Sequence, residues 1–292
     1  MPPEDAALAA AGAPTSVADV HHAAGRHVGA GPMTGAAGHA PSHPHPAAAT
    51  GTGFLHSVET AGAVDGPGVR FIFFTAGCLF RCLYCHNPDT WKLHHGREVT
   101  VEEALAEVRP YAGFLRIAGG VTFSGGEPMV QAGFVGALAA RIKTDLRLHV
   151  ALDTQGHLHA DLDDAWFAPF DLVLLDIKHS DPVQYHRLTG QDLQPTLDFA
   201  HRLVRLGKRM WIRYVLVPGL TDAEADILRL ADFIVTLGAA VERVEVLPFH
   251  QMGAHKWQDL GLHYELGDTP AATLADAEAA RALFASRGLE VY

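Results

Sequence analysis

All cysteines of this chain fall within eight consecutive positions. Cys78, Cys82 and Cys85 form a C-x3-C-x2-C pattern between Gly77 and Asn87, and the 292-residue chain contains no other cysteine. Thiolates are soft ligands that suit zinc and iron–sulfur clusters. An odd number of closely spaced thiols is typical of a reducing compartment and not of a disulfide framework. The spacing therefore predicts one metal centre held within a single loop.

Three interpretations of this loop are open on the residues alone. A 4Fe–4S cluster normally takes four cysteines, so three would leave one iron free to bind a substrate or cofactor. Zinc would use the same thiols with His86, but structural zinc sites usually add a second, distant pair of ligands, which the sequence lacks. A redox-active thiol pair is the third interpretation, and it is less favoured because the C-x-x-C motif has a third cysteine beside it. We favour the cluster, given the alternating strands and helices predicted around the loop.

The overall charge and the first residues exclude several classes of protein. The net charge is -11 and no long basic run occurs, which argues against binding nucleic acid or an anionic lipid surface. No apolar segment approaches the ~18 residues of a membrane span. The N-terminus carries acidic residues where a secretory signal needs positive charge. We therefore expect a soluble cytoplasmic protein.

Composition divides the chain into a leader and a core. Residues 1–52 are dominated by Ala, Gly, Pro, Thr and His, with no helical or strand periodicity, and such a segment is predicted to be disordered. A metal-scavenging tail is the alternative for this segment. Its histidines are His21, His22, His27, His39, His43 and His45. Residues 53–292 are expected to form one core domain.

Strands and helices alternate six times along the core, which predicts right-handed crossovers and a parallel sheet covered by helices. Six units are too few for a closed eight-stranded barrel. We expect an α/β fold, a partial (β/α)6 barrel with parallel strands and an open lateral mouth, and an open doubly wound sheet is the alternative. Thr100 with Glu103 forms a capping box, and Thr221 is expected to cap a later helix. The predicted strands are 69–76, 120–124, 147–153, 171–178, 209–219 and 242–250. The predicted helices are 100–111, 129–143, 195–206, 222–237 and 271–286, with a polar helical stretch after Gly156.

Each predicted strand ends in polar, charged or glycine residues that contribute little to stability. Ligands bind at the carboxyl ends of strands in parallel α/β folds, so these residues should gather on one rim with the cysteine loop. Taken singly, each has an ordinary explanation: Asp153 and Asp176 could cap helices, and His255 could be a loop histidine. The rim residues in chain order are Ser124, Gly125, Gly126, Glu127, Asp153, Thr154, Asp176, Lys178, Arg213 and His250, followed by His255.

Seven motifs in this order resemble the radical S-adenosylmethionine superfamily, and within it the activases of glycyl-radical enzymes. They are DGPGVRF (65–71), GCLFRCLYCHNPDTW (77–91), SGGEP (124–128), LDTQG (152–156), LLDIK (174–178), WIRYVLVPG (211–219) and HKW (255–257). The resemblance covers about 54–292 and is specific because the motifs are many. The 1–52 leader lies outside it. The ferredoxin-like cysteine insert usual in several related activases is missing.

The resemblance implies a role for each matching residue. The three cysteines would bind one 4Fe–4S cluster, whose open iron would hold S-adenosylmethionine. Asp65 would face the incoming substrate loop. The residues implied in binding S-adenosylmethionine are Tyr84, Cys85, His86, Gly125, Gly126, Glu127, Asp176, Ile177, Lys178, Arg213 and His255. The residues implied in binding a monovalent cation, Na⁺ or K⁺, are Asp153, Thr154 and Asp176.

The resemblance also implies the reaction and its partners. One-electron reduction of the cluster, by flavodoxin or a similar donor, would cleave S-adenosylmethionine to a 5′-deoxyadenosyl radical. That radical would take a hydrogen from the α-carbon of a glycine in pyruvate formate-lyase, and a glycine has no side chain to block the approach. We expect the activase to act as a monomer. Another glycyl-radical enzyme, or a small molecule, is the alternative substrate.

Overall fold

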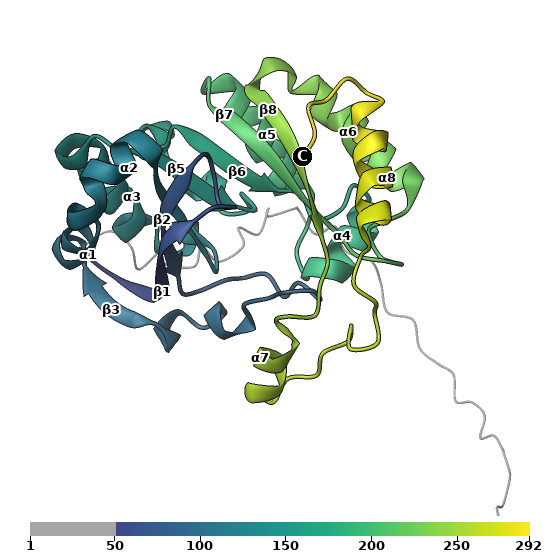
Figure 1. The fold of residues 1–292 in the computed structure, drawn as a ribbon, viewed down its shortest axis with the longest axis horizontal. Coiled ribbons are helices and arrows are strands. Elements are labelled where there is room, and N and C mark those ends of the chain that lie inside the picture. The colour runs from purple at the N-terminus through teal and green to yellow at the C-terminus, as the bar shows by residue number, and fades with distance from the viewer. Residues whose placement is uncertain (1–50) are drawn as a thin grey trace, which may run out of the picture. The chain divides into compact units, whose positions relative to one another are not determined.

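The computed structural model describes residues 51–292, so the predicted leader lies almost entirely outside the described residues. β1 begins at Thr52, the last residue assigned to the leader. The described chain forms one eight-stranded sheet in the order β3-β1-β2-β4-β5-β6-β7-β8 (Figure 1). Its strands are β1 (Thr52–Gly62), β2 (Val69–Thr75), β3 (Arg97–Thr100), β4 (Gly119–Gly125), β5 (His149–Thr154), β6 (Leu172–Asp176), β7 (Arg209–Leu216) and β8 (Val241–Pro248).

The six predicted strands are all present and run parallel, from β2 through β4, β5, β6 and β7 to β8. The sheet does not close, because within residues 51–292 β8 pairs with no strand other than β7. This confirms the partial barrel. β1 and β3 were not predicted, and they extend the sheet antiparallel beyond β2. Buried and less buried residues alternate only over the first part of β1, so its sequence gives a weak strand pattern.

Most helices follow the predicted alternation. Thr100 and Glu103 form the expected capping box, and a left-handed Gly207 with φ +64° follows the helix that ends at Arg205. The Thr221 cap was wrong. The N-cap residue of α6 (Glu224–Thr236) is Ala223. The Thr221 hydroxyl instead accepts from Val217 N at 2.7 Å and donates to Val215 O at 2.7 Å.

The predicted 129–143 helix consists of a 3₁₀ turn, α3 and a π turn, and the stretch after Gly156 contains only 3₁₀ turns. Three helices were not predicted: α2, α4 and α7. No helix within residues 51–292 has the length and apolar character needed to cross a bilayer. The helices are α1 (Val101–Val108), α2 (Ala112–Ala118), α3 (Ala132–Arg141), α4 (Pro182–Thr189), α5 (Gln194–Arg205), α6 (Glu224–Thr236), α7 (Ala254–Asp259) and α8 (Leu274–Ala285).

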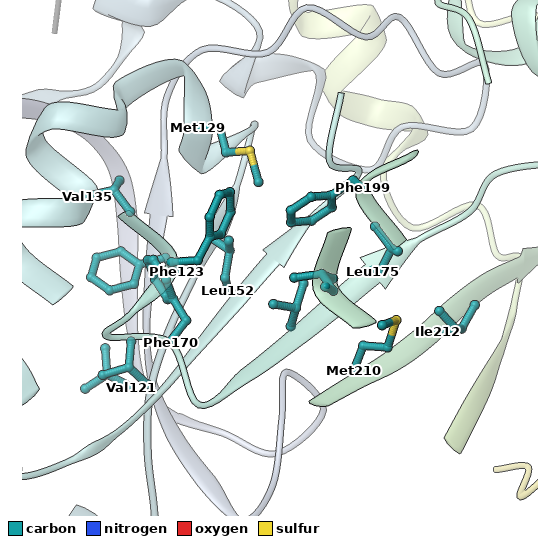
Figure 2. Packing of buried hydrophobic residues seen from close by; sticks show 14 of the residues in the cluster. Val121, Phe123, Met129, Val135, Leu152, Phe170, Leu175, Phe199, Met210 and Ile212 are labelled. Carbon is teal, nitrogen blue, oxygen red and sulfur yellow. The ribbon is translucent and has the colours of Figure 1, made fainter. Parts of the chain in front are cut away.

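Both faces of the parallel strands are buried. Leu152, Leu175 and Ile212 belong to the main core between sheet and helices, where Figure 2 shows them with Phe123 and Phe199. The alternate residues of the same strands, among them Leu174 and Trp211, form a second apolar cluster. Burial on both faces explains why the strands appear as continuous apolar runs. It also fixes the register that brings the polar strand ends to one rim.

Candidate functional site

One cavity of about 260 Å³ collects most of the predicted site residues at the carboxyl ends of the parallel strands. Its walls come from the cysteine loop and from the ends of β4, β5, β6 and β7. The predicted residues that line it are Asp65, Cys78, Cys82, Tyr84, Cys85, His86, Gly125, Gly126, Asp153, Asp176, Lys178 and Arg213. The structure thus gathers residues that lie up to 148 positions apart in the sequence.

Backbone hydrogen bonds fix the cysteine loop at both ends. Gly77 N donates to Thr90 O at 2.6 Å and Cys78 N donates to Trp91 O at 3.2 Å. Leu83 N donates to Leu188 O at 3.0 Å, at the end of α4. The loop is therefore held by the 3₁₀ turn that follows it (Pro88–Thr90) and by α4, through backbone contacts that do not involve the three thiols.

Cys82 is buried, Cys78 and Cys85 are partly buried, and all three thiols favour the neutral form. Burial raises the pKa of Cys78 to about 12, with a further contribution from the nearby Glu127. Burial also raises the pKa of Cys82 and of Cys85. Only a strongly positive centre would stabilise the thiolates here, which is the effect of a bound metal centre on its ligands. The donor set therefore fits a thiolate-bound iron–sulfur cluster.

His86 does not join the thiols as the zinc interpretation requires. Its ring stacks on His250 with the centroids 4.2 Å apart, and its Nε2 lies 2.9 Å from His250 O. Within residues 51–292, no three His, Cys, Asp or Glu side chains are arranged around a point where a single metal ion could bind.

Charged side chains of both signs form a further part of the cavity wall. Arg213 Nη1 lies 3.2 Å from Asp153 Oδ2 and 3.5 Å from Asp65 Oδ1. Lys178 Nζ lies 2.7 Å from Asp176 Oδ2. Burial acts to lower the pKa of Arg213, but the carboxylates, Asp153 first, outweigh it and raise that pKa. This wall can therefore bind a zwitterionic ligand through both its anionic and its cationic groups.

Two buried polar atoms of the cavity residues lack a hydrogen-bond partner. They are the Tyr84 hydroxyl and Asp153 Oδ1. Burial raises the pKa of Asp153 to about 6, although Arg213 opposes the shift. Buried polar atoms are nearly always paired, so these two atoms indicate where a polar ligand such as S-adenosylmethionine would bind.

Gly125 and Gly126 allow the turn after β4 to lie directly against the cysteine loop. Gly125 has φ +103°, which favours glycine. A Cβ on Gly126 would lie 2.3 Å from Gly77 O. Gly126 N donates to Thr75 O at 2.8 Å. This turn forms part of the cavity wall with its backbone instead of side chains.

Four predicted residues do not line the cavity. The Glu127 carboxylate is buried against Thr154, whose Oγ1 lies 2.7 Å from Oε1 and 2.8 Å from Oε2. Ile177 is buried in the main core. His255 is exposed, with Nδ1 3.0 Å from Met252 O. Contacts of these four side chains with S-adenosylmethionine or a cation therefore stay predictions.

Several residues that contact the cysteine loop were not singled out from the sequence. Trp257 Nε1 donates to Cys85 O at 2.9 Å, and Lys256 Nζ donates to Asn87 Oδ1 at 2.8 Å. Gln155 Nε2 lies 3.7 Å from Cys78 Sγ. The HKW and LDTQG motifs contain all three contacting residues, but only His255, Asp153 and Thr154 of these motifs were predicted as site residues.

Comparison with known proteins gives consistent relationships. A model of the radical SAM superfamily matches residues 72–231. Pyruvate formate-lyase-activating enzymes of Staphylococcus aureus strains USA300 and NCTC 8325 are each 47% identical over 241 residues, which cover 80% of this chain and 94% of theirs.

Two solved structures share the fold. A domain of a pyruvate-formate lyase-activating enzyme from Bacteroides vulgatus has 21% identity and a TM-score of 0.50, covering 59% of this chain and 97% of that one. Streptococcus suis SuiB bound to the precursor peptide SuiA has 16% identity and a TM-score of 0.59, covering 78% and 48%.

Proposed function

This chain belongs to the radical SAM superfamily and, within it, to the pyruvate formate-lyase-activating enzymes, and on that basis we propose that it installs a glycyl radical on pyruvate formate-lyase. Membership implies S-adenosylmethionine and a 4Fe–4S cluster as its cofactors. The observation that carries the proposal is the cavity that three thiols and two pairs of oppositely charged side chains line together.

In this proposal, Cys78, Cys82 and Cys85 are the protein ligands of the cluster. Their neutral, buried state favours them as ligands of a metal centre that supplies its own positive charge. When bound and reduced, the cluster would supply the electron for the cleavage of S-adenosylmethionine. The protein positions the reactants and excludes water.

The charged wall orients S-adenosylmethionine. Arg213 and Lys178 offer donors to its carboxylate and ribose oxygens, and the unpartnered Asp153 Oδ1 accepts from a cationic or hydroxyl group. The backbone of Gly125 and Gly126 lines the same cavity and can approach the methionine part closely.

We assign the remaining predicted residues to S-adenosylmethionine, to a monovalent cation and to the substrate segment. Tyr84 and His86 line the cavity beside the thiols, where the adenine would pack. Glu127, Ile177 and His255 would contact S-adenosylmethionine through small rearrangements of the loops that carry them. A monovalent cation would bind among Asp153, Thr154 and Asp176. Asp65, paired with Arg213, would face the glycine-bearing segment.

We propose further that the enzyme is a cytoplasmic monomer that takes its electron from flavodoxin or a similar donor. A net charge of -11 supports a protein substrate over a nucleic acid. The leader, 1–52, is proposed to be dispensable for this chemistry, because the motifs begin at Asp65.

Anaerobic reconstitution tests the proposal. The expected result is a brown protein whose reduced-cluster EPR signal changes on adding S-adenosylmethionine and which produces a glycyl-radical doublet in added pyruvate formate-lyase. A colourless protein with stoichiometric zinc would refute it. Cleavage of S-adenosylmethionine without a doublet in pyruvate formate-lyase would favour another glycyl-radical enzyme or a small-molecule substrate.

A further inference from the structure

A second cavity, of about 310 Å³, lies at the open edge of the sheet. Its walls come from the β1–β2 loop, β8, α8 and the C-terminal Tyr292. Tyr292 is fixed along β8, because its N–H donates to Val244 O at 2.9 Å and its carbonyl accepts from Val246 N at 3.0 Å. Figure 1 shows the C-terminus beside β8. Leu247 lines both this cavity and the one that holds the thiols.

Two guanidinium groups of this cavity have unused hydrogen-bond donors. Arg243 is sandwiched between Trp211 and Tyr292, with its guanidinium carbon 3.4 and 4.4 Å from their ring centroids. Its Nε is buried without a partner, and so is the Nε of Arg281 on α8. Among residues 51–292, Arg281 has no carboxylate within ion-pair distance, although the chain carries an excess of acidic residues. Two such donors in one cavity are typical of an anion site.

Glu245 connects this cavity to the one with the thiols. Its Oε1 accepts from Arg243 Nη2 at 2.6 Å, and its Oε2 lies 3.2 Å from Arg213 Nε. Arg213 in turn donates from Nη2 to Val64 O at 2.6 Å. Val64 lines the second cavity and is 70% exposed. A ligand bound at Arg243 would therefore lie next to the loop that carries Asp65.

We propose that the cavity of Arg243, Arg281 and Tyr292 binds a carboxylate side chain of the partner protein, close to the segment that carries its reactive glycine. This inference rests on the proposed function. Leu247 lines both cavities, so a polypeptide segment in the thiol cavity would lie next to this one. Carboxylates are the anions that the side chains of a polypeptide supply. Arg243 is held in place by aromatic stacking and by Glu245, whereas Arg281 has no carboxylate partner within residues 51–292. Arg281 can therefore form a charge-assisted hydrogen bond with an incoming carboxylate.

The test compares Arg281→Gln and Arg281→Lys with wild type in the anaerobically reconstituted full-length protein. Arg97→Gln removes the same charge at the opposite edge of the sheet, on β3, and is the matched control. Glycyl-radical formation is measured against the concentration of pyruvate formate-lyase, and 5′-deoxyadenosine formation is measured without it. We expect Arg281→Gln to raise the KM for the partner about tenfold, with kcat and partner-free 5′-deoxyadenosine formation unchanged. Arg281→Lys should raise the KM less, and Arg97→Gln should match wild type.

The outcomes separate the inference from the function on which it rests. If wild type forms the glycyl radical and Arg281→Gln has a KM within about twofold of it, the inference alone is overturned, since a lost charge-assisted hydrogen bond costs more than this. If wild type cleaves S-adenosylmethionine but forms no glycyl radical at any partner concentration, the proposed function fails and the inference fails with it. Inorganic phosphate is the probe for a small anion. If phosphate alters partner-free cleavage in wild type but not in Arg281→Gln, the cavity is a small-anion site and the inference is wrong.

Discussion

The hydroxyl of Thr154 lies 2.7 and 2.8 Å from the two oxygens of the buried Glu127 carboxylate. Glu127 also accepts from Met129 N at 3.0 Å, and Thr154 Oγ1 accepts from Gly156 N at 2.9 Å. This pair joins the turn after β4 to the end of β5. It therefore holds two walls of the thiol cavity in place without lining it.

Removing the Thr154 hydroxyl should destabilise the protein. Thr154→Val leaves Gly156 N without its acceptor and takes one donor from the Glu127 carboxylate, which keeps the bond from Met129 N. An unsatisfied buried group costs about 1–3 kcal/mol. Thr154→Ser keeps the hydroxyl and should lose much less. Urea denaturation under anaerobic conditions measures both. Equal stability of Thr154→Val and wild type would show that the pair is not structural, and a changed cation dependence alone would favour the cation role.

Gly126→Ala should be poorly tolerated. Its Cβ would lie 2.3 Å from Gly77 O, so the turn would be forced away from the cysteine loop, at about 1–3 kcal/mol. Gly113→Ala on α2 is the control, because nothing lies within 4 Å of its Cβ, and it should stabilise by about 0.5–1 kcal/mol. Thermal unfolding and the iron content after reconstitution are the measurements. Full iron loading and wild-type stability in Gly126→Ala would contradict the close packing.

Cys82→Ser should abolish cluster assembly. The Cys82 thiol is buried and shares the cavity with the other two thiols, and serine oxygen is a poor ligand for this type of centre. Iron and sulfide analysis after anaerobic reconstitution, together with the visible absorption, reports the result. Full iron loading and cleavage of S-adenosylmethionine by this variant would refute the ligand assignment.

Stability should fall as the pH drops below about 6.5. Burial lowers the pKa of His179, and the nearby Asp226 carboxylate offsets this shift only in part. In the folded chain His179 Nδ1 accepts from Asp181 N at 2.9 Å. The unfolded chain takes up a proton near pH 6.5, whereas the folded chain resists it. The contribution of the neutral ring is therefore present above pH 6.5 and is lost as the pH falls. His179→Asn keeps an acceptor that does not titrate, so its unfolding free energy should depend less on pH. An unchanged pH dependence in this variant would exclude His179 as a source.

The sequence predicted the parallel strands and the clustering of their ends because both depend on local patterns. Buried strands appear as apolar runs, and parallel connections place their carboxyl ends on one rim. The Thr221 cap failed because a nearby backbone N–H, that of Val217, competes for the same hydroxyl. Glu127 and Thr154 were expected at the rim because both stand at strand ends, and their roles as ligands stay predictions. Their mutual hydrogen bond depends on side-chain packing between β4 and β5, which no local pattern encodes.

α7 shows a second limit of the sequence. Trp257 and Lys256 contact the cysteine loop from 169 to 172 positions away, and a helix of six residues gives too short a pattern to recognise. The sequence likewise could not predict that Arg243 and Arg281 lie close together, because one is on β8 and the other on α8. Only the folded chain brings their unpartnered Nε atoms into one cavity.

The most direct measurement of the central claim is isotope transfer from the partner. Pyruvate formate-lyase carrying glycine deuterated at the α-carbon is incubated anaerobically with the reduced, reconstituted protein and S-adenosylmethionine. The 5′-deoxyadenosine is then analysed by mass spectrometry alongside the EPR signal. We predict one deuterium in the 5′-deoxyadenosine, formed together with the glycyl-radical doublet. Unlabelled 5′-deoxyadenosine with no doublet in pyruvate formate-lyase would contradict the account.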